Sequence, residues 1–116
     1  MLKNYIFFSL LLVAVNVNAF VQEIGPGVFV HIGKHLDIDD GYDGDICNIG
    51  FIVGEESIAV IDTGGSYLVA KELRKYISDN FKQPVKYVIN THAHLDHVYG
   101  NIVFSDADIF WPQRFT

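Results

Sequence analysis

Residues 46–65, ICNIGFIVGEESIAVIDTGG, contain two runs of β-branched and aromatic residues separated by one glycine and two glutamates. Such runs are typical of strands, and a short glycine-containing connection between them is typical of a hairpin. We therefore expect one strand over 46–53, a tight turn, and a second strand over 57–62. Asp62 ends the second strand beside a threonine and two glycines, where it either caps a turn or points into a site above the sheet.

The spacing of the apolar residues changes after Ser66. Residues 66–80, SYLVAKELRKYISDN, carry apolar side chains at helical spacing, Ser66 is a suitable N-cap, and Pro84 ends the pattern. Residues 85–89 then form a short apolar strand, and alternation over 28–32 predicts a strand upstream. Strand, helix and strand in this order indicate an α/β (α+β) fold with a crossover helix packed on the sheet.

A cluster of histidines, THAHLDH at 91–97, follows the last of these strands, at the sheet edge where ligands bind in open α/β folds. His92 and His94 are two residues apart, so in an extended segment both imidazoles project to one side and can bind one metal ion. A turn after His94 would bring Asp96 and His97 to a position beside the ion bound by His92 and His94. There they could bind a second ion. These ligand types fit zinc, and the spacing also allows iron or manganese.

The other candidate residues have less specific interpretations. His31 and His35 are expected to be ordinary core or surface histidines, and Asp106 and Asp108 are expected to be surface charges. Cys47, the single cysteine, is expected to be a buried, inert thiol rather than a nucleophile.

The acidic stretch DIDDGYDGD at 37–45 is predicted to be an exposed loop. It does not match a calcium-binding EF-hand loop. A glycine stands where that pattern needs an acid or amide, and no glutamate closes the loop.

The first 19 residues, MLKNYIFFSLLLVAVNVNA, have the features of a secretory signal peptide: Lys3 near the start, an apolar run, and Ala19 at a cleavage position. An uncleaved membrane anchor is the alternative. A spanning helix needs about 20 apolar residues, and the apolar run from Ile6 to Val15 is about half as long. We therefore expect one domain over 20–116 that is exported, periplasmic or secreted, without stable membrane association after cleavage.

Net charge limits the classes of partner. The chain has 8 basic and 14 acidic residues, and removal of Lys3 with the leader gives a net charge of −7. An acidic protein of this kind is not expected to bind nucleic acid, which requires a basic surface. One cysteine excludes an intramolecular disulfide, so stability must come from the core or from a metal. The expected partner is a small-molecule substrate, and the oligomeric state is left open.

The sequence THAHLDH, preceded by VIDTGG at 60–65, resembles the His-x-His-x-Asp-His signature of the metallo-β-lactamase-fold hydrolases. The resemblance extends from about residue 28 to residue 101. More narrowly, GDICNIGFIVGEESIAVIDTGGS and VINTHAHLDHVYGN are similar to the exported zinc metallohydrolases associated with quinoprotein oxidation and sulfur-oxidation systems.

This resemblance implies the N-terminal half of a four-layer αββα sandwich, truncated at its C-terminal side. By the same resemblance, His92 and His94 would bind the first of two zinc ions, and Asp96 and His97 the second. Asp96 would also act in catalysis by holding the hydroxide that the zinc ions generate, and Asp62 would support the ligand loop from behind.

Two classes of function are compatible with these residues. In the first, the chain is the N-terminal part of an exported zinc hydrolase that cleaves an ester, thioester or amide, including β-lactams. Alone it would be inactive, because the family takes further histidines and an aspartate from the C-terminal half, whereas no histidine follows His97 here. In the second, it is a non-catalytic periplasmic fragment that binds a metal or a partner. Whether the chain alone is an enzyme is left open.

Overall fold

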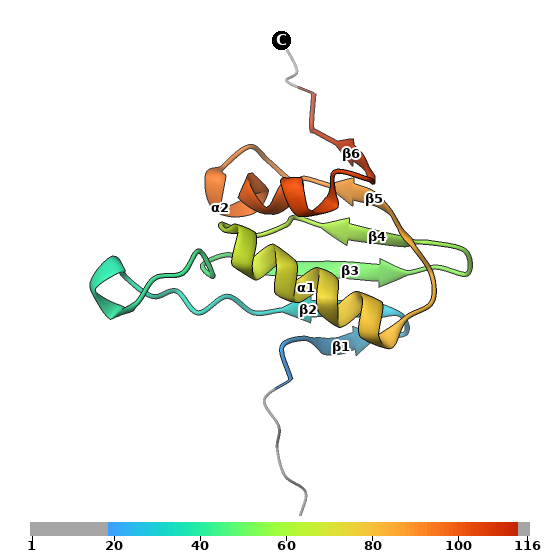
Figure 1. Ribbon diagram of the computed structural model, residues 1–116, viewed down its shortest axis with the longest axis horizontal. Coiled ribbons are helices and arrows are strands. Elements are labelled where there is room, and N and C mark those ends of the chain that lie inside the picture. The colour runs from blue at the N-terminus through green and yellow to red at the C-terminus, as the bar shows by residue number, and fades with distance from the viewer. Residues whose placement is uncertain (1–18, 114–116) are drawn as a thin grey trace, which may run out of the picture.

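The computed structural model describes residues 19–113, which form a six-stranded sheet with the strand order β1-β2-β3-β4-β5-β6 (Figure 1). The strands are β1 (Gln22–Gly25), β2 (Val28–His31), β3 (Ile49–Val53), β4 (Ile58–Ile61), β5 (Val85–Ile89) and β6 (Asp108–Phe110). The helices are α1 (Tyr67–Asn80) and α2 (Leu95–Val98), with 3-10 turns η1 (Ile38–Asp40) and η2 (Tyr99–Phe104).

The connections between strands confirm the predicted α/β order. Strands β1 to β4 are antiparallel neighbours, whereas β5 runs parallel to β4 and β6 runs parallel to β5. Helix α1 is the crossover between β4 and β5. The β3–β4 hairpin is closed by a hydrogen bond of 2.9 Å from the Gly54 amide to the Ser57 carbonyl.

The predicted boundaries differ from the observed ones at the start of this hairpin and at the sheet edges. Strand β3 begins at Ile49 rather than at 46, because Asp45 and Asn48 bond irregularly to residues 33 and 34 instead of forming a ladder. The edge strands β1 and β6 were not predicted. They have four and three residues, which is too short for a clear alternation.

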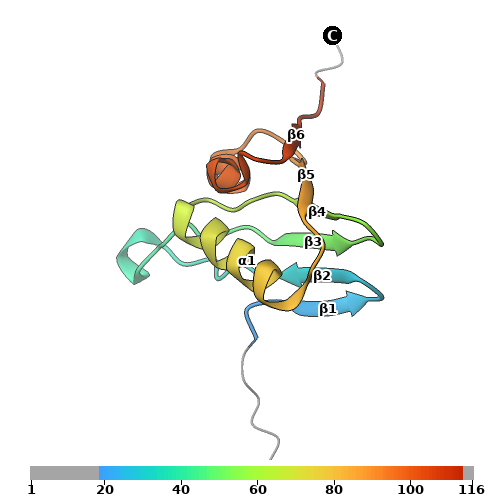
Figure 2. The same ribbon diagram turned by 45° about the vertical axis from the view of Figure 1, so that its right-hand side comes forward.

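Helix α1 packs its apolar side on one face of the sheet, as the crossing of the helix over β2 to β4 in Figure 2 shows. Ser66 is the N-cap, and its hydroxyl accepts a 3.2 Å hydrogen bond from the Val69 amide. The core between helix and sheet is formed by fully or nearly fully buried residues: Val69, Ala70, Leu73 and Ile77 of α1, Ile49, Phe51, Ile58, Val60 and Val88 of the sheet, and Phe104 of η2.

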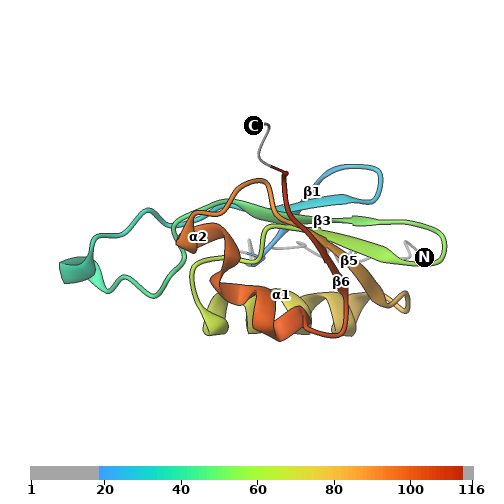
Figure 3. The same cartoon turned by 90° about the horizontal axis from the view of Figure 1, so that it is seen from above.

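Figure 3 shows α1 and η2 on one side of the sheet, and no described helix covers the opposite face. Strand pairing places Ile61, Ile89 and Phe110 in one row on this face. Ile89 is 42% exposed and Phe110 is 53% exposed. Ile52, on the same face, is 46% exposed. A sheet face of this composition is ordinarily buried against another layer.

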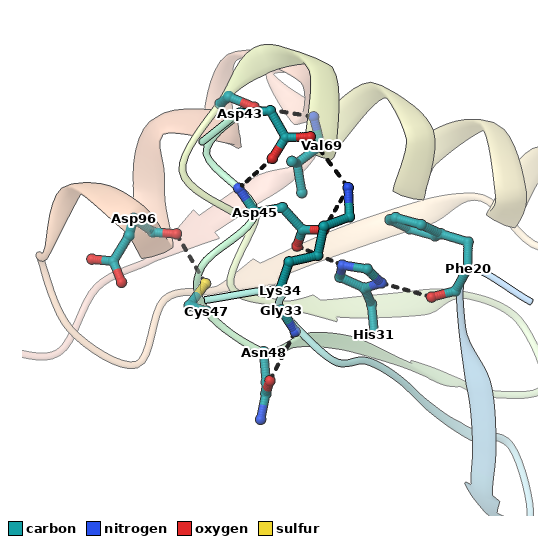
Figure 4. A network of polar contacts seen from close by, with 11 residues as sticks. Phe20, His31, Gly33, Lys34, Asp43, Asp45, Cys47, Asn48, Val69 and Asp96 are labelled. Atoms are coloured by element: carbon teal, nitrogen blue, oxygen red, sulfur yellow. Dashed lines mark hydrogen bonds and ion pairs between the residues drawn. The ribbon is translucent and has the colours of Figure 1, made fainter. Parts of the chain in front are cut away.

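His31 is a satisfied core histidine, as predicted for it. Its ring stacks on Phe20 at 4.0 Å, and its nitrogens lie 2.7 Å from the Phe20 carbonyl oxygen and 2.6 Å from Asp45 Oδ1 (Figure 4). The prediction of an exposed loop over 37–45 is wrong for its last two residues, Gly44 and Asp45, which are buried. Asp45 is only 3% exposed because it pairs with His31, while most of the loop is exposed. His35 is an exposed residue.

Asp106 and Asp108 are exposed, as predicted. Asp106 has a partner that the sequence did not suggest: the Arg74 guanidinium donates to both of its carboxylate oxygens, at 2.5 and 2.7 Å. These hydrogen bonds lower the pKa of Asp106 to about 2. The pair ties α1 to the segment after η2.

The predicted signal peptide lies outside the described residues except for Ala19. Within residues 19–113, neither helix has the length and apolar content needed to cross a bilayer.

The packing of α1 predicts a large difference between two leucines of the same helix. Leu73 is fully buried and Leu68 is 68% exposed. Leu73→Ala should lower the free energy of unfolding by about 2–5 kcal/mol, because it leaves a cavity in the core. Leu68→Ala is the matched control and should change it by no more than about 0.5 kcal/mol. Urea unfolding followed by circular dichroism measures both, and equal effects would contradict this packing.

Candidate metal centre

The candidate site lies at the sheet edge where the parallel strands β4 and β5 end. Asp62 follows β4, and the segment 91–97, called here the ligand loop, begins two residues after the end of β5. A hydrogen bond of 3.0 Å from the Asp62 amide to the Ile89 carbonyl keeps these strand ends together. The parallel pairing therefore brings together two motifs that are about 30 residues apart in the sequence.

Asp62 anchors the ligand loop through three hydrogen bonds. Its carboxylate accepts from the Thr91 amide at 2.8 Å, from the Thr91 hydroxyl at 2.7 Å, and from His97 Nδ1 at 2.8 Å. Asp62 has a left-handed backbone conformation, with φ of 56°, and is only 2% exposed. Non-glycine residues adopt this conformation at a cost, and aspartate tolerates it better than most. The backbone thus turns so that the carboxylate faces the loop.

These hydrogen bonds also assign the protons of two histidines. A carboxylate only accepts, so His97 Nδ1 carries a proton, and in the neutral imidazole Nε2 is left with a free lone pair. The Thr91 hydroxyl gives its proton to Asp62 and therefore accepts from His92 Nδ1, which lies 2.9 Å away. His92 Nε2 is free for the same reason. A carboxylate that fixes histidine tautomers in this way is common behind metal-binding histidines.

The imidazole ring of His92 lies beside the rings of both other histidines of the ligand loop. The ring centroids of His92 and His94 are 4.6 Å apart, and those of His92 and His97 are 4.0 Å apart. His97 Nε2 lies 3.4 Å from Asp96 Oδ2. The structure therefore brings the rings of His92, His94 and His97 to the same sheet edge. Among the described residues, ligand atoms come within 4.8 Å of one another only for Asp96, His97 and Cys47, so His92 and His94 do not join that group. The assignment of the four predicted ligands to one ion or two stays a prediction.

The distance between His97 and Asp96 fits a bound cation. A deprotonated Nε2 and a carboxylate oxygen both present lone pairs, so neither can donate a hydrogen bond to the other. Two ligand atoms bound tetrahedrally to zinc at about 2.0–2.1 Å would be about 3.3 Å apart. The observed 3.4 Å is close to that separation. By this test the residues present fit zinc.

A second set of contacts holds the start of η2 against the glycine loop after Asp62. The Thr63 amide donates to the His97 carbonyl at 2.9 Å, and the Gly100 amide donates to the Gly64 carbonyl at 3.1 Å. A Cβ at Gly100 would lie 2.2 Å from the Thr63 carbonyl oxygen. The backbone can approach this closely only because residue 100 is glycine.

Cys47 is the residue at this site that the sequence did not reveal. It is buried as predicted, and its thiol donates to the Asp96 carbonyl at 2.9 Å (Figure 4). Burial, with a smaller effect of Asp96 and Asp62, raises the pKa of Cys47 to about 12. Ligand atoms of Cys47, Asp96 and His97 all lie within 4.8 Å of one another. No sequence signal links residues 49 positions apart.

A cavity of the described residues lies away from the ligand loop. It has a volume of about 430 Å³ and is lined by residues around His31, including Phe20, Lys34, Asp45 and Glu72. None of the predicted metal ligands lines it. Within this cavity His31 and Asp45 hydrogen-bond to each other, so they are not free to bind a ligand. The ligand loop is therefore the better candidate for the functional site.

Comparisons with known proteins agree with this geometry. A family model described as the metallo-beta-lactamase superfamily matches residues 42–110. The alkyl/aryl-sulfatase BDS1 of Saccharomyces cerevisiae is 38% identical over 68 residues, which cover 56% of this chain and 10% of the sulfatase. The mono-zinc form of the metallo-beta-lactamase FIM-1 from Pseudomonas aeruginosa is a structural neighbour with a TM-score of 0.62 and 22% identity.

The chain spans a minor part of both proteins. The match to FIM-1 covers 74% of this chain and 37% of the FIM-1 chain. The match supports the predicted half of an αββα sandwich: a mixed sheet with its helices on one face.

The position of Asp62 predicts a loss of metal affinity on Asp62→Asn. Asparagine keeps the size of the side chain but can no longer offer two anionic oxygens to Thr91 and His97, so the tautomer of His97 is no longer fixed. Zinc affinity of the purified chain should fall about 10–100-fold, measured by competition with a chromophoric chelator.

The matched control is Asp79→Asn, which makes the same change at an exposed position of α1 that pairs with Lys75. It should leave zinc affinity unchanged. Equal zinc affinity in Asp62→Asn and the native chain, with both folded, would show that Asp62 does not orient a ligand.

Proposed function

Because the chain belongs to the metallo-beta-lactamase superfamily, we propose that it forms the zinc-binding N-terminal part of an exported metallohydrolase. The observation that carries this proposal is the approach of His97 Nε2 to Asp96 Oδ2, 3.4 Å apart, at the sheet edge where the rings of His92 and His94 also lie. The hydrolase-type fold follows from the family; export, the reaction and the substrate are proposals.

In this proposal each polar residue of the site has a definite task. His92, His94, Asp96 and His97 would hold zinc, two ions in the complete protein. Zinc held by these residues would supply a water molecule of lowered pKa and would polarise the scissile bond. Asp96 is also positioned to accept a hydrogen bond from the nucleophile, and Asp62 keeps His97 in the tautomer that binds.

The proposed substrate is a small molecule with an ester, thioester or amide bond, β-lactams included. The similarity to the yeast alkyl/aryl-sulfatase adds sulfate esters as a second candidate class. Sulfate and carboxylic esters both develop negative charge on oxygen as the bond breaks, and a cationic site stabilises that charge. An association with quinoprotein or sulfur-oxidation systems is the narrower proposal, supported by the two sequence stretches that contain Cys47 and the ligand loop.

The second function, a non-catalytic periplasmic fragment that binds a metal or a partner, has its own support. The sheet face with Ile52, Ile89 and Phe110 is exposed in the described residues and could contact another protein. The two functions differ in one measurable property, because only the first predicts turnover.

The test is hydrolysis by the zinc-loaded protein that contains this chain, with one chromogenic substrate for each bond class: carboxylic ester, thioester, β-lactam and alkyl sulfate. Asp96→Ala should reduce turnover of the accepted substrate by at least about 100-fold, the usual effect of removing a positioned proton acceptor. Asp79→Ala, an exposed aspartate on α1, is the control and should retain full turnover.

Unchanged turnover in Asp96→Ala would contradict the role given to Asp96. Stoichiometric zinc without turnover of any substrate would contradict the hydrolase and favour the binding function. Amino-terminal sequencing of the protein recovered from the culture medium or periplasm tests export, which predicts Phe20 as the first residue.

A further inference from the structure

Cys47 lies beside the metal ligands although it comes from a distant part of the chain. It stands two residues before β3, at the same end of the β3–β4 hairpin as Asp62, and its Sγ is 2.9 Å from the Asp96 carbonyl oxygen (Figure 4). One ligand atom each from Cys47, Asp96 and His97 lies within 4.8 Å of the other two. The three residues offer a thiol, a carboxylate and an imidazole.

We infer that Cys47 Sγ is a third protein ligand for the ion held by Asp96 and His97, so that this chain alone builds a Cys–Asp–His site for zinc. The inference rests on the proposed zinc site and adds a ligand to it. Three protein ligands and one open position are the usual arrangement of a catalytic zinc ion.

The orientation of the two partner ligands supports this site. The hydrogen bond to Asp62 turns the free Nε2 of His97 toward Asp96 Oδ2 at 3.4 Å. Cys47 is 8% exposed and is held at the same place by its contact with the Asp96 backbone. His97 and Cys47 are therefore held by hydrogen bonds within the protein before any ion binds, and the Asp96 carboxylate lies beside His97 Nε2.

A thiolate would also change which ion the site prefers. Sulfur is a soft ligand that favours zinc and disfavours magnesium, calcium and manganese, whereas a site of imidazole and carboxylate alone discriminates less. Coordination removes the proton from Cys47, so binding of the ion releases one proton from the thiol.

A purely structural role for Cys47 makes a different prediction. If its thiol only donates a hydrogen bond to the Asp96 carbonyl, serine should replace it fully, because a hydroxyl is the stronger donor. If Sγ binds the ion, Cys47→Ser keeps this hydrogen bond but removes the sulfur ligand. Zinc affinity should then fall by at least about tenfold.

The experiment is a titration of the full chain with Co²⁺, which replaces zinc and reports its ligands by absorption. The native chain should show visible d–d bands together with a near-ultraviolet band of thiolate-to-Co²⁺ charge transfer. Cys47→Ser and Cys47→Ala should lose the charge-transfer band. His94→Ala is the control within the ligand loop and should retain it, because His94 is not part of the Cys–Asp–His group.

The outcomes separate this inference from the proposed function. Visible bands without charge transfer in the native chain would overturn the role of Cys47 and leave the zinc site of the other residues intact. A native chain that binds no Co²⁺ would also overturn it, because three adjacent ligands should hold the ion, while the hydrolysis assay would still judge the proposed function. Charge transfer that persists in both Cys47 variants would overturn it as well.

Discussion

The carboxylate of Asp62 is the constraint on which the candidate site depends. It is buried, and it accepts hydrogen bonds from the backbone and hydroxyl of Thr91 and from His97. A buried carboxylate without partners would be very costly, so the ligand loop and Asp62 stabilise each other. Together with the contact between Thr91 and His92, these hydrogen bonds place a proton on Nδ1 of His92 and of His97, and in the neutral imidazoles leave both Nε2 atoms free. One side chain thus fixes both the path of the loop and its chemistry.

The sheet brings this constraint into place. Parallel pairing of β4 and β5 requires the crossover helix α1, and the fully buried Leu73 and Ala70 hold that helix on the sheet. The β4 end and the ligand loop then meet at one edge, where Gly100 allows the backbones to approach closely. The opposite, apolar face takes no part in the site within residues 19–113. In a two-sheet αββα sandwich, this is the face that would pack against the second sheet.

The site is formed by residues of different origin. The ligand loop supplies three histidines and an aspartate within six positions, a compact source of ligands. Cys47 precedes the β3–β4 hairpin and Asp62 follows it, and each hydrogen-bonds to a residue of the ligand loop. A metal held by such a set would be supported on several sides by the rigid sheet, which is the condition for a well-defined coordination geometry.

The sequence alone determined the features that depend on local spacing. The hairpin, the helix after Ser66, the strand over 85–89 and the histidine cluster all follow from periods and motifs within a few residues. Tertiary structure alone decided the left-handed turn at Asp62, the burial of Asp45 against His31, the short edge strands and the place of Cys47 beside Asp96. These features depend on contacts between residues far apart in the chain. Such contacts are set by the packing of the whole sheet and leave no periodic trace in the sequence.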